Sequence, residues 1–396
     1  MRILVLSSLA QSLLNFRGQL LAAMVGEGHE VVACAPERDP IVEERLAAMG
    51  IRFVQTKMSR AGSNPLLDLN TLADYMELIL RERPGVVLAY TQKPIIYGGL
   101  AARLAGGCRF YALISGLGYV FSPAADHRKV LRTLVRKLYA MALKRAQAIF
   151  VFNSDDASEL VRQKIIDRRQ KVIQVPGSGV DLNHFRPQAV PPGPPTFLMI
   201  ARLMRDKGLQ QFVEAARIVR QRCPEARFHL LGKFEEANPT GISQAELDGW
   251  LQEGAITYLG QTDDVRPHLT ESSVFVLPSF YREGLPRTIL EAMATGRAVV
   301  TTDMPGCRDP ISPGENGLIV RPQDSQDLAR ALLRFVEEPG LAETMGKASR
   351  RIAEARYDVR LVNAQLLSEM NLSRSGSYEV VAAPLAADMP AAVRGA

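Results

Sequence analysis

The stretch VFVLPSFYREGLPRTILEAMATGRAVVTT, residues 274–302, shows the pattern on which the whole chain is built. The apolar run VFVLP is typical of a buried strand, PRTILEAMAT of a helix and AVVTT of a second strand. Strands that alternate with helices in this way form parallel sheets whose two faces are covered by the helices. The stretch therefore predicts one strand–helix–strand unit of an α/β domain.

The junction between this strand and this helix carries two carboxylates, Glu283 in the loop and Glu291 in the helix. Pro286 suits the first helical position because its missing N–H is not needed there, and Gly296 is a typical helix stop. Glu291 then lies about 7–8 Å along the helix axis, and its side chain leans back toward the N-terminus. We expect both acids to face the carboxyl edge of the sheet, where α/β proteins bind ligands.

The same alternation extends through all 396 residues, a length that suffices for two hydrophobic cores. A proline-rich break at 176–195 divides the chain. We predict two doubly wound, Rossmann-like α/β domains that face a central cleft. The first spans 1–185 and is completed by a C-terminal helix at about 357–372, and the second spans 186–356. The tail, 373–396, is predicted to be disordered.

The composition is that of a soluble globular protein, with 47% apolar and 23% charged residues. No apolar run approaches the roughly 18 residues of a membrane-spanning helix. The start, MRILVLSSLA, resembles a short signal peptide, but the apolar run also fits a first strand, which we favour. The scattered cysteines, Cys34, Cys108, Cys223 and Cys307, fit reduced thiols in a cytoplasmic protein.

The segment HRKVLRTLVRKLYAMALKRAQ, residues 127–147, carries seven cations and no acid. Apolar residues fall between the cations at helical spacing, so the segment predicts a basic amphipathic helix. Such a helix lies on an anionic membrane surface, or it packs on the sheet and leaves a solvated basic face. No aromatic-rich basic sheet or recognition-helix motif accompanies it, which argues against nucleic acid as a partner.

The second domain's first strand ends in ARLMRDKG, residues 201–208, which brings Arg202 and Lys207 to the same sheet edge as the two acids. Two cations there suit a diphosphate, although Arg and Lys are also common in solvated loops. Arg287 lies in the first turn of the helix, where it opposes the helix dipole. Its i,i+4 pairing with Glu291 has the poorer orientation, so we interpret Arg287 as the ligand of an anion.

These two motifs resemble a known enzyme family. ARLMRDKG together with EGLPRTILEAMATGRAVVTTDMPGCRD is similar to the retaining, nucleotide-sugar-dependent glycosyltransferases of the GT-B fold with the E-x7-E signature, of the group 1 or family 4 type. SLLNFRGQLLAAMVGEGHEV, QKPIIYGGLAARLAG and ISGLGYVF resemble the bacterial branch that acts on polyprenyl-diphosphate-linked sugars. The resemblance spans roughly residues 1 to 370.

The resemblance implies a role for each motif residue. Glu283 contacts the donor sugar, Glu291 binds the ribose hydroxyls, and Arg202 with Lys207 binds the donor diphosphate. Glu283, Arg202 and Lys207 are thus the expected catalytic residues. The other expected substrate-binding residues are Gly284, Leu285, Arg287, Gly116, Gly118, Asn15, Phe16 and Arg17.

The first domain departs from the family pattern at one position. Many relatives carry a histidine after the strand that corresponds to RFYALI, and this chain has SGLGYVF there. Gly116 and Gly118 either let backbone N–H groups approach the donor or form a tight turn. The glycine-rich loop after the first strand is reduced to Gly18, beside Asn15, Phe16 and Arg17.

The expected function is a retaining transfer of a hexose or N-acetylhexosamine from a UDP-linked nucleotide sugar to a lipid-diphosphate-linked sugar in capsule, O-antigen or exopolysaccharide biosynthesis. The resemblance implies same-face attack, with the leaving phosphate taking the acceptor's proton. No D-x-D triplet occurs and the histidines lack metal-ligand spacing, so we expect no metal and no cofactor besides the donor. The expected location is cytoplasmic, peripherally bound to the inner face of the cell membrane. Because the resemblance implies a polyprenyl-linked acceptor, we expect the helix from Arg128 to Arg145 to dock on an anionic membrane surface.

Two alternatives remain at this point. A nucleotide-sugar epimerase of the same architecture would need general acid and base groups in the cleft. A non-catalytic two-domain protein that binds nucleotides or sugars would bind without turnover, but it gives no reason for the grouping of Arg202, Lys207, Glu283 and Glu291. A dinucleotide oxidoreductase is disfavoured because no G-x-G-x-x-G follows the first strand.

Overall fold

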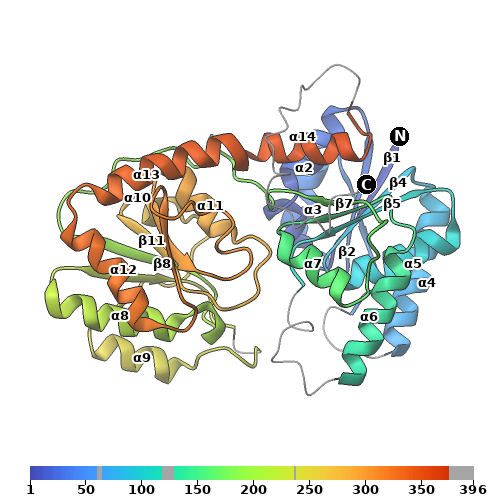
Figure 1. The fold of residues 1–396 in the computed structure, drawn as a ribbon. Helices are drawn as coiled ribbons and strands as arrows, with labels where there is room; N and C mark the ends of the chain where they lie inside the picture. The colour runs from blue at the N-terminus through green and yellow to red at the C-terminus, as the bar shows by residue number, and fades with distance from the viewer. Residues whose placement is uncertain (60–64, 118–128, 236–237, 374–396) are drawn as a thin grey trace. The chain divides into compact units, whose positions relative to one another are not determined.

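The structure is a computed structural model that describes residues 1–59, 65–117, 129–235 and 238–373. The chain forms two compact units (Figure 1). Unit 1 contains Met1–Ser178 and the chain from Val359 onward, and unit 2 contains Gly179–Asp358. The units therefore divide at 178/179 and 358/359, where the sequence placed boundaries at 185 and 356. Of the tail predicted at 373–396, Ser373 alone lies among the described residues.

Unit 1 is built on a parallel sheet of seven strands in the order β3-β2-β1-β4-β5-β6-β7. Its strands are β1 Arg2–Leu6, β2 Glu30–Ala35, β3 Arg52–Gln55, β4 Val86–Tyr90, β5 Arg109–Ile114, β6 Ala148–Val151 and β7 Val172–Gln174. The central strands are apolar almost throughout because helices cover both faces. The strand order reverses between β1 and β4, which marks the switch point of this sheet.

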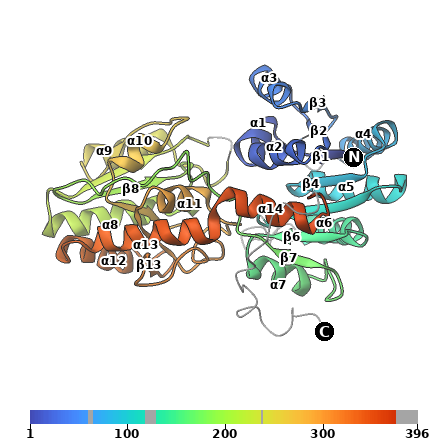
Figure 2. The same cartoon turned by 90° about the horizontal axis from the view of Figure 1, so that it is seen from above.

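The helices of unit 1 pack in two layers (Figures 1 and 2). They are α1 Ala10–Asn15, α2 Gly18–Gly26, α3 Pro40–Ala48, α4 Pro65–Glu82, α5 Gln92–Ala105, α6 Lys129–Leu143, α7 Ser154–Arg162 and α14 Val359–Glu369. Helices α4, α5 and α6 lie side by side, and α14 packs against α2. The predicted basic helix, 127–147, corresponds to α6 at Lys129–Leu143, and Arg128 lies outside the described residues. The predicted C-terminal helix, about 357–372, corresponds to α14 at Val359–Glu369.

Unit 2 repeats the design with a parallel sheet of six strands in the order β10-β9-β8-β11-β12-β13. Its strands are β8 Thr196–Ile200, β9 Arg227–Leu231, β10 Thr257–Tyr258, β11 Val274–Leu277, β12 Ala298–Thr302 and β13 Gly317–Val320. The opening stretch is β11, α11 and β12, and β11 and β12 pair in parallel as predicted. The switch point lies between β8 and β11, so the loops that follow these strands are neighbours.

Helices cover both faces of this second sheet (Figure 1). They are η3 Arg205–Lys207, α8 Leu209–Arg222, α9 Gln244–Gln252, α10 Arg266–Thr270, α11 Arg287–Ala294, α12 Ser325–Glu337, α13 Leu341–Ile352 and the π-helical turn η4 Ala353–Tyr357. Helix α8 packs on α12, and α11 packs on α13. Among the described residues, no helix combines the length and the apolar character needed to cross a membrane.

Candidate active site

The loop after β8 carries the two cations that the sequence singled out. Arg202 lies two residues after the end of β8 and is half-exposed, whereas Lys207 ends the short helix η3 and is only 8% exposed. Gly208 makes the turn into α8 with φ +82°, and a Cβ at this position would lie 2.1 Å from the Pro278 carbonyl oxygen. Only glycine allows η3 to pack so closely against the exit of β11.

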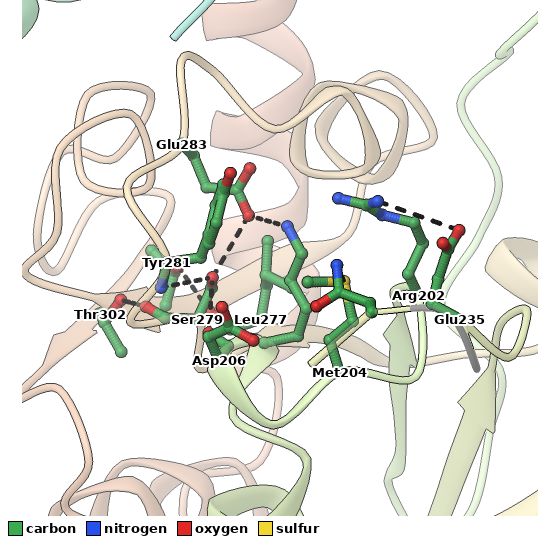
Figure 3. A network of polar contacts seen from close by, with 12 residues as sticks. Arg202, Met204, Asp206, Glu235, Leu277, Ser279, Tyr281, Glu283 and Thr302 are labelled. Atoms are coloured by element: carbon green, nitrogen blue, oxygen red, sulfur yellow. Dashed lines mark hydrogen bonds and ion pairs between the residues drawn. The ribbon is translucent and has the colours of Figure 1, made fainter. Parts of the chain in front are cut away.

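A second contact joins the loops that follow β8 and β11. The backbone carbonyl of Asp206 accepts hydrogen bonds from the N–H groups of Phe280 at 2.9 Å and Tyr281 at 3.0 Å. Figure 3 shows Asp206, Ser279 and Tyr281 together beneath Glu283. Two segments more than 70 residues apart in the chain are thereby fixed relative to each other at the sheet edge.

The centre of the site is an ion pair between the Lys207 ammonium and Glu283 Oε1. The ammonium also lies over the ring of Tyr281, 5.0 Å from its centroid, in a cation–π contact. The Ser279 hydroxyl lies 3.2 Å from the same Glu283 oxygen. Burial, followed by the nearby Glu283 carboxylate, raises the pKa of the Tyr281 phenol, so Tyr281 is a neutral platform for the cation.

Arg202 lies beside this ion pair and has a different acidic neighbour, Glu235. Its guanidinium is 3.9 Å from Glu235 Oε1, at the outer limit of an ion pair (Figure 3). The half-exposed guanidinium is therefore loosely held and can exchange Glu235 for a bound anion at small cost. The structure thus brings Arg202, Lys207 and Glu283 together at the carboxyl ends of β8 and β11.

Helix α11 begins at Arg287, one residue later than predicted. Pro286 is its N-cap residue, with an extended ψ of 118°, and its carbonyl accepts the first helical hydrogen bond from Ile289 N at 3.2 Å. An N-cap residue behaves in this way: its backbone angles are not helical, but its carbonyl already accepts the first hydrogen bond of the helix. The helix ends at Ala294 with Thr295 as its C-cap, and Gly296 follows with φ +81°, which confirms the glycine predicted to stop the helix.

The interpretation that Arg287 is not the partner of Glu291 is wrong. Arg287 Nε lies 2.8 Å from Glu291 Oε1. Glu291 is only 7% exposed, and burial raises the pKa of its carboxyl to about 7, although Arg287 opposes the shift. A desolvated carboxylate is stabilised by the nearest cation much more than an exposed carboxylate on a helix surface is. The small orientation preference of exposed i,i+4 pairs therefore does not determine whether Arg287 pairs with Glu291.

Sequence reasoning missed several residues that shape this site, among them Ser279, Tyr281, Gly306 and Cys307. Gly306 has φ +79°, and a Cβ there would lie 2.5 Å from the Gly284 carbonyl oxygen, so the turn after β12 supports the loop that carries Glu283. The Cys307 thiol is fully buried, and burial, then Glu283, raises its pKa. The sequence Met-Pro-Gly at 304–306 is typical of a turn, but it does not indicate which part of the chain the turn contacts.

The residues predicted in unit 1 lie near the switch point of its own sheet. Asn15 ends α1, Phe16 is exposed, and Arg17 is buried at the N-cap of α2. The Arg17 guanidinium donates to Ser178 Oγ at 3.2 Å and lies over the rings of Tyr90 and Phe152. These contacts hold it inside the unit.

The remaining predicted positions of unit 1 follow β5. Gly116 has φ +126°, a conformation that favours glycine and agrees with a turn after this strand. Gly118 lies outside the described residues. A feature that the sequence did not reveal is Thr91, which follows β4 with φ +66° and ψ 158° and donates to Ser8 Oγ at 2.8 Å. This strained backbone lies at the switch point between β1 and β4.

Both units match known glycosyltransferase domains. Residues 16–177 match the family described as glycosyl transferase 4-like domain, and residues 194–338 match glycosyl transferases group 1. The chain is a glycosyltransferase. The two matches fall in unit 1 and unit 2 respectively, so the family relation covers both halves of the enzyme.

Curated relatives agree with this assignment. The chain is 28% identical to the N,N'-diacetylbacillosaminyl-diphospho-undecaprenol alpha-1,3-N-acetylgalactosaminyltransferase of Campylobacter jejuni, over 93% of this chain and 97% of the relative. It is 26% identical to the UDP-Gal:alpha-D-GlcNAc-diphosphoundecaprenol alpha-1,3-galactosyltransferase of Escherichia coli, over 68% of this chain and 71% of the relative.

Solved structures show the same fold. A sucrose-phosphate synthase from Thermosynechococcus elongatus superposes with a TM-score of 0.76 at 20% identity, over 94% of this chain and 98% of that one. HepE from Anabaena, solved in complex with UDP, superposes with a TM-score of 0.74 at 19% identity, over 94% of this chain and 100% of that one. The glycosyltransferase therefore has the GT-B fold, which confirms the fold class expected from the sequence.

Proposed function

We propose that this glycosyltransferase moves a hexose or an N-acetylhexosamine from a UDP-sugar to a sugar carried on a polyprenyl diphosphate, with retention of configuration. Such a reaction would serve the biosynthesis of capsule, O-antigen or exopolysaccharide. The observation that carries the proposal is the contact between Lys207 and Glu283 beside Arg202 at the carboxyl ends of β8 and β11. The names of both curated relatives, which act on undecaprenyl-diphosphate-linked sugars, support the acceptor class.

Charge development in the reaction explains the two cations. Breaking the bond between sugar and phosphate leaves negative charge on the nucleoside diphosphate and an oxocarbenium-like sugar. Lys207, held by the Tyr281 ring in a site that excludes most water, offers a prepositioned point charge. Arg202 offers a fork that can bind two phosphate oxygens. These side chains would stabilise the leaving group without a metal ion, so we propose that the enzyme is metal-independent.

The two acids suit the two carbohydrate rings of the donor. Glu283, which lies in the loop after β11, would accept hydrogen bonds from the sugar hydroxyls. Glu291, buried in the first turns of α11, would accept from the two ribose hydroxyls with its two oxygens. Gly284 and Leu285 form the loop between them, and we propose that this loop and Arg287 line the diphosphate.

Retention would arise from attack on the face that the diphosphate leaves. The acceptor hydroxyl forms the new bond to the anomeric carbon, the bond from that carbon to the phosphate oxygen breaks, and the leaving phosphate takes the acceptor's proton. Glu283 is the carboxylate that would otherwise serve as a nucleophile. Its pairing with Lys207 fits a carboxylate that orients the sugar. A glycosyl adduct trapped on Glu283 would contradict same-face attack.

The exposed face of α6 supports association with an anionic membrane. Leu134 and Met141 on this face are 50% and 44% exposed, and Lys137, Lys144 and Arg145 are exposed beside them. An interfacial helix inserts such apolar side chains between lipids and keeps its cations at the level of the headgroups. We propose peripheral binding to the inner face of the cell membrane, where a polyprenyl-linked acceptor is found.

Turnover tests the proposed reaction directly. UDP-hexoses and UDP-N-acetylhexosamines are incubated with a lipid-diphosphate-linked sugar, and the elongated lipid is detected by mass spectrometry. The enzyme should release UDP only when the acceptor is present. Interconversion of the nucleotide sugar without acceptor would identify an epimerase, and binding without turnover would identify a non-catalytic binding protein.

Liposome flotation tests the membrane proposal. The wild type should float with vesicles that contain anionic lipid, and charge reversal at Arg132, Arg136 and Lys137 should abolish flotation. The double substitution Leu134→Ser and Met141→Ser should weaken flotation as well, because it removes the apolar part of the face. Binding that is unchanged in the charge-reversed variant would contradict the proposal.

A further inference from the structure

Ser279 occupies the centre of the hydrogen-bond network beneath Glu283 (Figure 3). It follows β11 and is fully buried. Its Oγ has three polar neighbours: Glu283 Oε1 at 3.2 Å, the Asp206 carbonyl oxygen at 3.3 Å and the N–H of Tyr281, which donates to it at 3.2 Å. A hydroxyl has one proton to donate, so only one of the two oxygens receives it.

The neighbours of Asp206 decide where that proton goes. The Asp206 carbonyl already accepts from Phe280 N at 2.9 Å and from Tyr281 N at 3.0 Å, and the Tyr281 N–H is shared between this carbonyl and Ser279 Oγ. The carboxylate of Glu283 is charged, and hydrogen bonds to charged acceptors are about twice as strong as those between neutral groups. The Ser279 hydroxyl therefore donates to Glu283 Oε1.

We propose that Ser279 is a positioning residue for Glu283, whose hydroxyl fixes the rotation of the carboxylate that faces the donor sugar. The proposal rests on the role assigned to Glu283 above. Lys207 pairs with the same oxygen, and a bound diphosphate would give Lys207 a second anion to bind. The Ser279 hydrogen bond would then continue to orient the Glu283 carboxylate during transfer.

Ser279 can act in this way because its own backbone is anchored. The Thr302 hydroxyl at the end of β12 donates to the Ser279 carbonyl, and the Thr301 hydroxyl donates to the Leu277 carbonyl at 2.8 Å. Both threonines are fully buried. These bonds fix the loop to the neighbouring strand, so the hydroxyl is presented from a rigid support, which accurate positioning of a catalytic group requires.

The test compares Ser279→Ala with Ser272→Ala, a matched control. Ser272 is also fully buried in unit 2, and its hydroxyl donates to the Leu269 carbonyl at 2.9 Å. Ser279→Ala should lower kcat at least tenfold, while KM for the donor and the Kd of UDP stay within about twofold of wild type. Ser272→Ala should leave kcat unchanged.

Two further variants separate positioning from folding. Ser279→Cys keeps nearly the same volume but provides only a weak donor, so it should lose kcat like Ser279→Ala with little change in Tm. Ser279→Thr retains the hydroxyl and should recover part of the lost rate. A kcat within twofold of wild type in both Ser279→Ala and Ser279→Cys would overturn the proposal, as would a loss of UDP binding equal to the loss of rate.

The same assays distinguish this inference from the proposed function. If the wild type transfers no sugar, or if Glu283→Ala remains active, the function or the site is wrong and the positioning role falls with it. If the wild type is active and Glu283→Ala is not, normal kcat in the Ser279 variants overturns the positioning role alone.

Discussion

Lowering the pH from 8 to 6 should weaken binding of the donor, because the Glu291 carboxyl takes up a proton in this range. Burial raises the pKa of this carboxyl to about 7. In the role proposed for it, Glu291 as a carboxylate would accept hydrogen bonds from two ribose hydroxyls, whereas the protonated form would present a donor to the same hydroxyls. Donor binding therefore favours enzyme in which Glu291 is ionised, and the fraction of such enzyme falls as the pH drops below 7.

The expected change in the apparent Kd of the donor follows from the pKa of Glu291 and from the linkage between proton binding and donor binding. With a pKa near 7, about one molecule in eleven is ionised at pH 6, so the apparent Kd rises about tenfold relative to pH 8. This factor corresponds to about 1.4 kcal/mol. Because binding selects the ionised form, the complex should release nearly one proton at pH 6 and almost none at pH 8.

Isothermal titration calorimetry between pH 5.5 and 8 measures both quantities. The ligand is an intact UDP-sugar, since the terminal phosphate of free UDP titrates near pH 6 and would add its own slope. Two buffers with different ionisation enthalpies give the number of protons released. Glu291→Gln keeps the shape of the side chain and cannot ionise, so it should bind more weakly at pH 8 and show no pH dependence in this range.

Two results would refute the reasoning. One is a Kd of the wild type that is constant between pH 6 and 8. The other is a pH dependence of equal size in Glu291→Gln, which would locate the titrating group elsewhere.

Other properties of the site can be tested in the same preparations. Lys207→Ala should lower kcat by about two orders of magnitude while the Tm stays near that of wild type, because the lost charge acts on the leaving diphosphate; a kcat within threefold of wild type would remove Lys207 from the mechanism. Dialysis against EDTA should leave turnover unchanged, and restoration of a lost rate by Mg²⁺ or Mn²⁺ would contradict metal independence. Gly208→Ala should destabilise unit 2 by about 2 kcal/mol or more, seen as a lower urea midpoint, since φ is +82° and the new Cβ would meet the Pro278 carbonyl. Glu291→Gln should gain stability relative to wild type as pH rises from 4.5 through 7, because a raised carboxyl pKa contributes stability at low pH that is lost over this window; equal Tm differences at pH 5 and 8 would contradict the sign.

The sequence was most informative where periodicity and topology act together. Alternating apolar runs and helices predicted both parallel sheets, because a strand buried on both faces has a recognisable composition. The carboxyl-edge rule then placed Arg202, Lys207 and Glu283 side by side without any knowledge of distances. The boundary of α11 was predicted to within one residue from Pro286 alone.

The prediction failed where tertiary burial decides the chemistry. The strength of the Arg287–Glu291 pair depends on desolvation of Glu291, which is a property of the packed unit and not of the helix. The roles of Ser279 and Tyr281 depend on a carbonyl that lies more than 70 residues away in the chain, at Asp206. A serine and a tyrosine after a strand carry no sign of such a partner.

On the proposed roles, the ion pairs Lys207–Glu283 and Arg287–Glu291 would favour a nucleotide sugar over a simple anion. Each cation is paired with an acid, so the two pairs together add little net charge to attract inorganic phosphate from a distance. An inorganic phosphate that displaced the two acids from their cations would not supply the carbohydrate hydroxyls as hydrogen-bond donors to the two carboxylates. A nucleotide sugar exchanges phosphate oxygens for the cations and hydroxyls for both acids. On the proposed roles, each carboxylate is thus a competitor that only a ligand with hydroxyl groups next to its charge can satisfy.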